Sequence, residues 1–259
     1  MVEKKTYEPG TFCWVELATS DASAAKTFYT SLLGWTFQDM PGGAGPYTLL
    51  KKNGKDVAGL YAIRPDQQGM PPNWSSYVSV ESADQSAAKA KELGGTVLME
   101  PFEVEDLGRM AVIRDPDGAF FSLWQPRQLA GAGVVNEPGA FCWNELYATD
   151  PKKAADFYTG LFGWTRNARH MDLREYVIFE KSGSMLAGMM KTPKEWGPIP
   201  PHWLVYFAVD DADHAVDSAK SLGANAMFPP MDIENVGRFS ILTDPQGAGF
   251  AVIKLASPA

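Results

Sequence analysis

Cysteine, histidine, positive charge and long apolar runs are all scarce in this sequence. The 259 residues include only two cysteines, Cys13 and Cys142, too few for a disulfide framework. Both lie in a Phe-Cys-Trp context, and we interpret each as a buried, reduced thiol. No stretch approaches the ~20 apolar residues that cross a bilayer. No hydrophobic segment follows the charged N-terminus, as a secretion signal would require. These shortages predict a soluble, cytoplasmic protein.

The charge balance excludes another class. Lys and Arg number 23 against 31 Asp and Glu, which gives a net charge of -8. That sign is unfavourable for a protein that binds nucleic acid or an anionic membrane surface. Hydrophobic residues make up 45% of the chain, enough for a substantial core. We therefore expect a globular protein with neither a nucleic-acid nor a membrane partner.

The chain is an internal repeat. Residues 10–127 match residues 139–256 without a gap, at a constant offset of 129, with about a third of the positions identical. FYTSLLGWT at 28–36 corresponds to FYTGLFGWT at 157–165, and DPDGA at 115–119 to DPQGA at 244–248. A repeat of this length predicts two homologous domains. We expect a first domain over residues 1–128, a linker of small residues over 129–138, and a second domain over 139–259.

Each domain shows the same order of elements. FCWVEL alternates apolar and polar residues as a strand does, and Asp21 is a suitable N-cap for a helix that ends at Gly34. Asn53-Gly54 predicts a hairpin. A second strand and helix follow, and then three strands, the last two joined at the Asp-Pro-Asp-Gly turn. Each half of a domain is therefore predicted to be a βαβββ unit, which places the chain in the α+β class.

The helix motif FY-x-x-L-x-G-W, the strand and Asp before it, and the GR…DPxG hairpin carry a resemblance. Together they resemble the vicinal oxygen chelate superfamily, which includes glyoxalase I, bleomycin-resistance proteins, fosfomycin-resistance enzymes and extradiol dioxygenases. The chain is most similar to tandem actinobacterial members labelled as hydroxylases. The resemblance implies two tandem glyoxalase-like domains. In each, two βαβββ units would form a half-open, eight-stranded barrel with the substrate on its concave face.

The resemblance also implies a metal site, for which this chain lacks the ligands. Metal-using members carry His, Gln or Glu at inward strand positions, because a divalent ion needs such donors. The strands at 57–63 and 186–192 contain no His or acidic residue. The other matching positions hold Trp14, Ser75 and Ser122 in the first domain and Trp143, Leu204 and Ala251 in the second. We therefore expect no metal ion and no other cofactor.

Glu16 and Glu145 are the most notable polar residues. Each lies two residues after the inward Trp of its strand and so shares its inward face. Burial in an apolar pocket would raise the pKa of such a carboxyl and suit it to general acid/base chemistry. The alternative is structural: each Glu pairs with a buried arginine, Arg109 or Arg238, and fixes the strand geometry.

Three further residues complete the candidate set. Tyr77 and Tyr206 match between the repeats and could bind a ligand carbonyl or orient a carboxylate; a tyrosine in the core is the alternative. His202 lies at the mouth of the same strand as Tyr206. Glu16, Glu145, Tyr206 and His202 are therefore candidate catalytic residues, although a surface or capping role is favoured for His202.

Several functions remain open. The first is metal-independent binding of a hydrophobic, planar small molecule in Trp-lined cavities, because aromatic surfaces favour such ligands. The second is a metal-free lyase or isomerase that uses Glu16 or Glu145. The third is a metal-dependent glyoxalase or dioxygenase with displaced ligands, and the fourth an interaction protein with vestigial pockets. A monomer and a homodimer are both compatible with the sequence. The candidate ligand-binding residues are Trp14, Ser75, Tyr77, Ser122, Trp143, Leu204 and Ala251.

Overall fold

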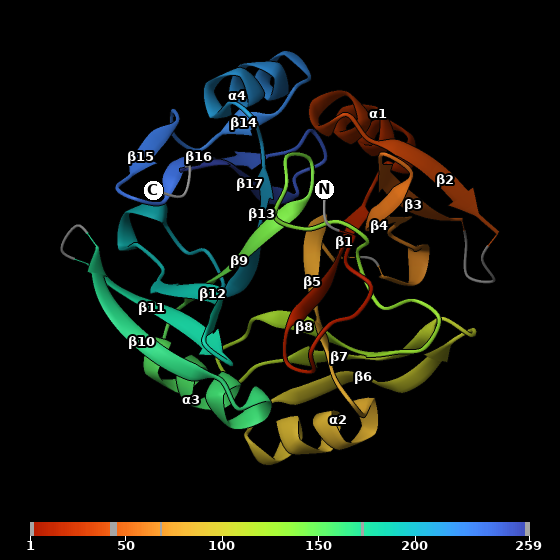
Figure 1. Ribbon diagram of the computed structural model, residues 1–259, viewed down its shortest axis with the longest axis vertical. Helices are drawn as coiled ribbons and strands as arrows, with labels where there is room; N and C mark the ends of the chain where they lie inside the picture. Colours follow the sequence, from red (N-terminus) through yellow and green to blue (C-terminus); the bar gives the residue numbers. More distant parts are fainter. Residues whose placement is uncertain (1–2, 42–45, 68, 172–173, 257–259) are drawn as a thin grey trace.

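The computed structural model describes residues 3–41, 46–67, 69–171 and 174–256 (Figure 1). The first repeat forms one mixed sheet with two helices. Its elements are β1 (Phe12–Thr19), α1 (Ala22–Leu33), β2 (Thr36–Met40), β3 (Tyr47–Lys52), β4 (Lys55–Ala62), the 3-10 turn η1 (Pro65–Gln67), β5 (Asn73–Ser79), α2 (Ala83–Glu92), β6 (Thr96–Val104), β7 (Gly108–Arg114) and β8 (Phe120–Pro126).

The second repeat forms a second sheet in the same way. Its elements are β9 (Phe141–Ala148), α3 (Pro151–Phe162), β10 (Thr165–Met171), β11 (Arg174–Lys181), β12 (Ser184–Lys191), η2 (Lys194–Trp196), β13 (His202–Ala208), α4 (Ala212–Ser221), β14 (Asn225–Ala226), β15 (Met231–Ile233), β16 (Gly237–Thr243) and β17 (Gly249–Leu255).

The strand order confirms the predicted fold. The first sheet runs β2-β3-β4-β1-β5-β8-β7-β6, and the second runs β10-β11-β12-β9-β13-β17-β16-β14, with β15 paired to β16. In each sheet the first strands of the two βαβββ units lie side by side and antiparallel at the centre. The sheets are half-open, as the resemblance implied, and they do not close into barrels.

Local sequence explains where the elements begin and end. The Asp21 side chain accepts a hydrogen bond from the Ala24 amide at 3.0 Å and so caps α1. Gly34 ends that helix with a φ of 64°, in the left-handed region that glycine tolerates. Asn53 and Gly54 have φ values of 50° and 77°, as expected in a tight hairpin between β3 and β4. The predicted caps and turns are confirmed here.

The two sheets pack against each other through their outer faces. Strands β5 and β8 of the first sheet contact β13 and β17 of the second, α1 contacts α4, and α2 contacts α3. Matched hydrogen bonds cross this interface in both directions. Tyr29 donates to Asp244 and Tyr158 donates to Asp115, each at 2.9 Å. The interface therefore has an approximate two-fold character.

The other tryptophans that match between the repeats support the same interface. Trp74 and Trp203 donate to the hydroxyl oxygens of Tyr29 in α1 and Tyr158 in α3, each within its own repeat, at 2.9 and 2.8 Å. Trp35 and Trp164 instead reach across to backbone carbonyls of the other repeat, at 2.6 and 2.7 Å. All four are buried in the hydrophobic core.

The segment between the repeats is packed against the first sheet. Ala132 and Val134 are buried, and the amides of Ala132 and Gly133 donate to carbonyls of Cys13 in β1 and Asp56 in β4. Cys13 is fully buried and Cys142 partly buried, and both thiols are free. None of the helices in the described ranges has the length and apolarity to span a membrane.

Candidate functional site

The central strands of the first sheet bring the predicted site residues onto one face. In the pairing of β1 with β5, Trp14 lies opposite Tyr77 and Glu16 lies opposite Ser75. In the pairing of β5 with β8, Tyr77 lies beside Ser122. Paired residues point to the same side of a sheet. All five therefore lie on the concave face, opposite the face that contacts the second sheet.

The second sheet repeats this arrangement. Trp143 lies opposite Tyr206, Glu145 opposite Leu204, and Tyr206 beside Ala251. The concave faces of the two sheets are therefore equivalent surfaces, and their differences are confined to individual side chains.

Glu16 is held by two tyrosine hydroxyl groups. Tyr47, from β3, donates to one carboxylate oxygen at 2.7 Å, and Tyr77, from β5, donates to the other at 2.9 Å. Burial raises the pKa of Glu16 above its ordinary value, and the two phenol hydrogen bonds oppose that rise. Burial, followed by the nearby charge of Glu16, raises the pKa of Tyr61 in β4 to about 12. The group therefore joins four strands around one carboxyl.

Glu145 keeps the two matched partners in the second sheet. Tyr176 donates to it at 2.7 Å and Tyr206 at 3.1 Å. Burial raises the pKa of Glu145, and Tyr147, Tyr176 and Tyr206 act in the opposite direction. Trp143 donates its indole N–H to the Tyr176 hydroxyl at 3.2 Å.

Tyr47 and Tyr176 are part of this arrangement but were not identified from the sequence. Each hydroxyl lies against a glycine in the next strand. A β-carbon on Gly59 would lie 2.7 Å from Cζ of Tyr47 and closer still to its hydroxyl oxygen, and Gly188 is related to Tyr176 in the same way. The signal was available in the repeat, because both the tyrosine and the glycine match at the offset of 129.

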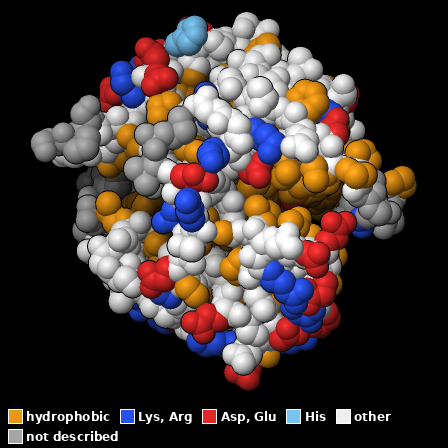
Figure 2. Space-filling model, turned by 45° about the vertical axis from the view of Figure 1, so that its right-hand side comes forward, with side chains coloured by type: hydrophobic (Ala, Val, Ile, Leu, Met, Phe, Trp, Pro, Cys, Tyr) orange, Lys and Arg blue, Asp and Glu red, His pale blue; other side chains and the backbone are white. Residues whose placement is uncertain are grey.

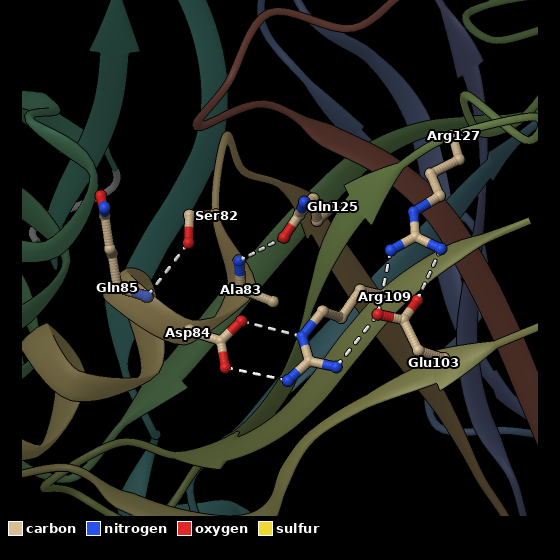
Figure 3. A network of polar contacts seen from close by, with 8 residues as sticks. All are labelled: Ser82, Ala83, Asp84, Gln85, Glu103, Arg109, Gln125 and Arg127. Atoms are coloured by element: carbon tan, nitrogen blue, oxygen red, sulfur yellow. Dashed lines mark hydrogen bonds and ion pairs between the residues drawn. The ribbon is translucent and has the colours of Figure 1, made fainter.

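The predicted pairing of the glutamates with arginines is wrong. Arg109 lies on the outer face of β7, where it makes two hydrogen bonds to Asp84 in α2, at 2.8 and 2.9 Å, and one to Glu103 in β6 (Figure 3). Arg238 does the same with Asp213 and Asp232. Each arginine lies on the opposite side of its sheet from the glutamate. It forms ion pairs that connect a helix to a strand near the edge of that sheet.

The two concave faces differ in how far they are filled. Where the first sheet has Ala18 and Ser75, the second has Tyr147 and Leu204, both almost completely buried. Glu145 is 6% exposed, whereas Glu16 and Ser75 are only half-buried. Figure 2 shows a hollow lined with apolar side chains on the side where the first sheet opens. The strand register places three exposed apolar side chains, Met40, Phe102 and Phe120, on the same face of the first sheet as Glu16.

Aromatic side chains cover Tyr147 in the second sheet. The ring of His202 stacks on Tyr147 with centroids 5.2 Å apart, and Trp196 from η2 packs against it at the same distance. The His202 Nδ1 lies 2.9 Å from the Pro200 carbonyl oxygen, and burial lowers the pKa of this imidazole. The structure thus brings Glu145 and Tyr206 together and places His202 in an aromatic stack on Tyr147.

Trp14 and Trp143 differ in their accessibility. Trp14 is 4% exposed, so it lies beneath other side chains of the first concave face, while Trp143 is only half-buried. Ser122 is 3% exposed and Ala251 is fully buried. An incoming ligand in the first hollow would therefore meet Glu16, Ser75 and Tyr61 more directly than Trp14.

The residues at the metal positions of the fold family do not fit a metal ion. The first sheet presents an indole and two hydroxyl groups there, and the second presents an indole, a leucine and an alanine. Imidazole and carboxylate groups are the usual ligands of such ions. Within the described ranges, no three His, Cys, Asp or Glu side chains are grouped as metal ligands. No chemical step is therefore assigned to a metal here.

Comparisons with known proteins agree with this fold. The family described as the Glyoxalase/Bleomycin resistance protein/Dioxygenase superfamily matches residues 11–123 and 131–252. The chain is 42% identical to "Putative glyoxylase CFP32" of Mycobacterium tuberculosis, over 99% of each chain. It is 35% identical to "Anthracycline biosynthesis protein DnrV" of Streptomyces peucetius, over 96% of this chain and 94% of the relative.

Solved structures with similar folds are more distant in sequence. A Mn(II)-bound glyoxalase from Novosphingobium aromaticivorans has a TM-score of 0.66 at 16% identity, over 95% of this chain and 82% of that one. The 2,3-dioxygenase LapB from Pseudomonas sp. KL28 has a TM-score of 0.67 at 13% identity, over 98% and 96%. At these identities the likeness concerns the fold alone. By its two matched segments, the chain belongs to the glyoxalase, bleomycin-resistance protein and dioxygenase superfamily.

Proposed function

We propose that this protein binds a hydrophobic, planar small molecule on the concave face of the first sheet, without a metal ion. The observation that carries the proposal is the contrast between two matched faces. Both keep the glutamate and the two matched tyrosines, but Glu16 is half-buried beside an apolar hollow, whereas Glu145 is 6% exposed and is flanked by the larger side chains Tyr147 and Leu204. Pockets with apolar walls and a few converging polar groups are typical ligand sites.

The relatives are consistent with such a ligand. The Streptomyces peucetius relative is named for anthracycline biosynthesis, and anthracyclines are planar, polycyclic aromatic ketones. Such a scaffold suits a face that carries the exposed apolar side chains of Met40, Phe102 and Phe120, because apolar area removed from water drives association. A polycyclic aromatic ketone is therefore the ligand class with which to begin.

A second candidate is a metal-free lyase or isomerase. It is favoured by the raised pKa of Glu16 and by the two phenols that hold its carboxylate in one orientation. A carboxyl whose pKa is raised toward neutrality can both accept and return a proton. In this candidate, Glu16 would move a proton next to an activated carbonyl of the bound compound while Tyr47 and Tyr77 hold its carboxylate in place.

Titration calorimetry with anthraquinone, on protein pretreated with a chelator and checked for metal content, tests the binding proposal. We expect one equivalent per chain to bind. The double substitution Ala18→Tyr and Ser75→Leu gives the first face the side chains of the second and should abolish binding. Glu103→Gln, on the outer face, is the control and should leave binding unchanged. If no aromatic ketone binds, or if the filled variant binds as well as the wild type, the proposal fails.

The same samples separate the two candidates. Recovery of the compound unchanged after long incubation supports binding alone. Conversion that is lost in Glu16→Gln, but retained in Glu103→Gln, supports the lyase or isomerase.

A further inference from the structure

The concave face of the first sheet carries a strip of three polar side chains, Glu16, Ser75 and Ser122, which we call the polar strip. Glu16 and Ser75 are directly paired across β1 and β5, and Ser122 lies one strand further, beside Tyr77. In the second sheet only the glutamate is kept, since Leu204 and Ala251 replace the two serines. The polar strip is therefore a property of the first face.

The hydrogen bonds within the polar strip determine which donors and acceptors remain for a ligand. Each oxygen of Glu16 already accepts one hydrogen bond, from Tyr47 or from Tyr77. The Asn73 amide nitrogen donates to the Pro71 carbonyl at 2.9 Å, so its oxygen faces Ser75, and the Ser75 hydroxyl donates to that oxygen at 3.1 Å. Because the Ser75 proton is used in this way, Glu16 and Ser75 both present lone pairs to the hollow.

Ser122 supplies the complementary group. The residue is 3% exposed, and no hydrogen bond joins its hydroxyl to another described residue. Since the hydroxyl lies beside Tyr77 on the concave face, it is free to donate to an acceptor atom of a bound molecule.

In the described ranges, no Lys or Arg is paired with these groups. The hydrogen-bond partners of the strip are tyrosine and asparagine, and no Lys or Arg contributes to the shifted pKa of Glu16; the charge of Arg64 acts instead on Tyr61. A negatively charged ligand would therefore meet the Glu16 carboxylate without a cation paired to that carboxylate. An uncharged donor suits the strip, and a carboxylate does not.

We infer that the polar strip selects an uncharged hydroxyarene, whose aromatic hydroxyl donates to Glu16 with Ser75 as a second acceptor, while Ser122 donates to another oxygen of the same ligand. This inference rests on the proposed function, because it takes the first hollow as the ligand site. It adds the anchoring group and the residues that determine specificity. A methoxy group has no proton to donate to Glu16 or Ser75, so the hydroxyl should dominate discrimination.

A matched series of anthraquinones tests the inference at about pH 6, well below the range in which a simple phenol ionises. The compounds are anthraquinone, its 2-hydroxy and 2-methoxy derivatives, and anthraquinone-2-carboxylate. We expect the 2-hydroxy compound to bind at least ~10-fold more tightly than the 2-methoxy compound. The carboxylate should bind more weakly than the unsubstituted ring system.

Substitutions in the polar strip test whether it causes the preference for the 2-hydroxy over the 2-methoxy compound. Glu16→Gln should reduce the hydroxy-to-methoxy preference to within about 3-fold, and Ser75→Ala should reduce it in part. Ser75→Ala also keeps the test decisive if Glu16→Gln does not fold. Glu103→Gln is the control and should retain the full preference.

The outcomes for the inference and for the proposed function are distinct. Equal affinity for the hydroxy and methoxy compounds would overturn the inference and leave the proposed function standing. The inference is also overturned if the preference survives in both strip variants, or if it is lost in Glu145→Gln instead of Glu16→Gln. Absence of binding by all four compounds would contradict the proposed function itself.

Discussion

The substitution Gly59→Ala tests how tightly the Glu16 group is packed. The new β-carbon would lie 2.7 Å from Cζ of Tyr47 and 3.2 Å from a Glu16 carboxylate oxygen, so the phenol has to move. The backbone is not the obstacle, because Gly59 does not have a positive φ. The variant therefore reports on the contact between Tyr47 and Glu16.

The expected magnitude follows from two opposing contributions. Loss of the Tyr47 hydrogen bond to the Glu16 carboxylate costs about 1.5–3 kcal/mol. Replacing glycine by alanine within a strand stabilises the folded state by about 0.5–1 kcal/mol. We therefore expect the free energy of unfolding to fall by about 0.5–2.5 kcal/mol relative to wild type.

Urea unfolding followed by tryptophan fluorescence measures this change. A double-mutant cycle with Tyr47→Leu isolates the contact, because the alanine has nothing to displace once the phenol is absent. Gly59→Ala should then cost nothing, or stabilise slightly. If Gly59→Ala is equally destabilising in both backgrounds, the argument from the Tyr47 contact is refuted.

Three further predictions concern other parts of the molecule. Because burial raises the pKa of Glu16, the folded state binds its proton more tightly than the unfolded state does. The stabilisation that this proton gives the folded state is complete below the ordinary glutamate pKa and is lost as the pH rises through the raised pKa. In urea unfolding from about pH 4 to pH 8, the free energy of unfolding should therefore decline less in Glu16→Gln than in wild type. Tyr29→Phe leaves the buried Asp244 carboxylate without its phenol donor and should lower the free energy of unfolding by about 1–3 kcal/mol; an unchanged urea midpoint would contradict this. Arg109→Ala removes only exposed ion pairs, so its effect in the same assay should be smaller than that of Tyr29→Phe, and a larger effect would show that the network is structural.

Much of the fold was predictable because its signals are local or repeated. Asp21, Gly34 and the Asn53-Gly54 turn each determine the backbone over a few residues, and the structure confirms them. The repeat at an offset of 129 gave the two tandem domains. Alternation along FCWVEL predicted correctly that Trp14 and Glu16 share a face.

The partners of Glu16 could not be derived in the same way. Tyr47 comes from a strand two positions away in the sheet, and its reach depends on the absence of a side chain at Gly59. The arginine prediction failed because the single sequence does not give the register of β7. Arg109 pairs with Gln125 and Glu103, which places it on the outer face with α2. Side-chain facing in distant strands follows from pairing, which is a property of the assembled sheet.

The crossed hydrogen bonds from Tyr29 to Asp244 and from Tyr158 to Asp115 have a consequence for how this chain is assembled. Each repeat provides a helix tyrosine for the turn of the other and receives one in return, so the surface on one repeat is nearly complementary to itself. Either repeat expressed alone would expose its side of this interface, with the tyrosine and the aspartate lacking their partners. We would expect it to pair with a second copy of itself. The covalent connection thus converts what would be a concentration-dependent dimer into a single cooperative unit. Within that unit the two copies have been free to differ on their concave faces, where no contact with the partner constrains them.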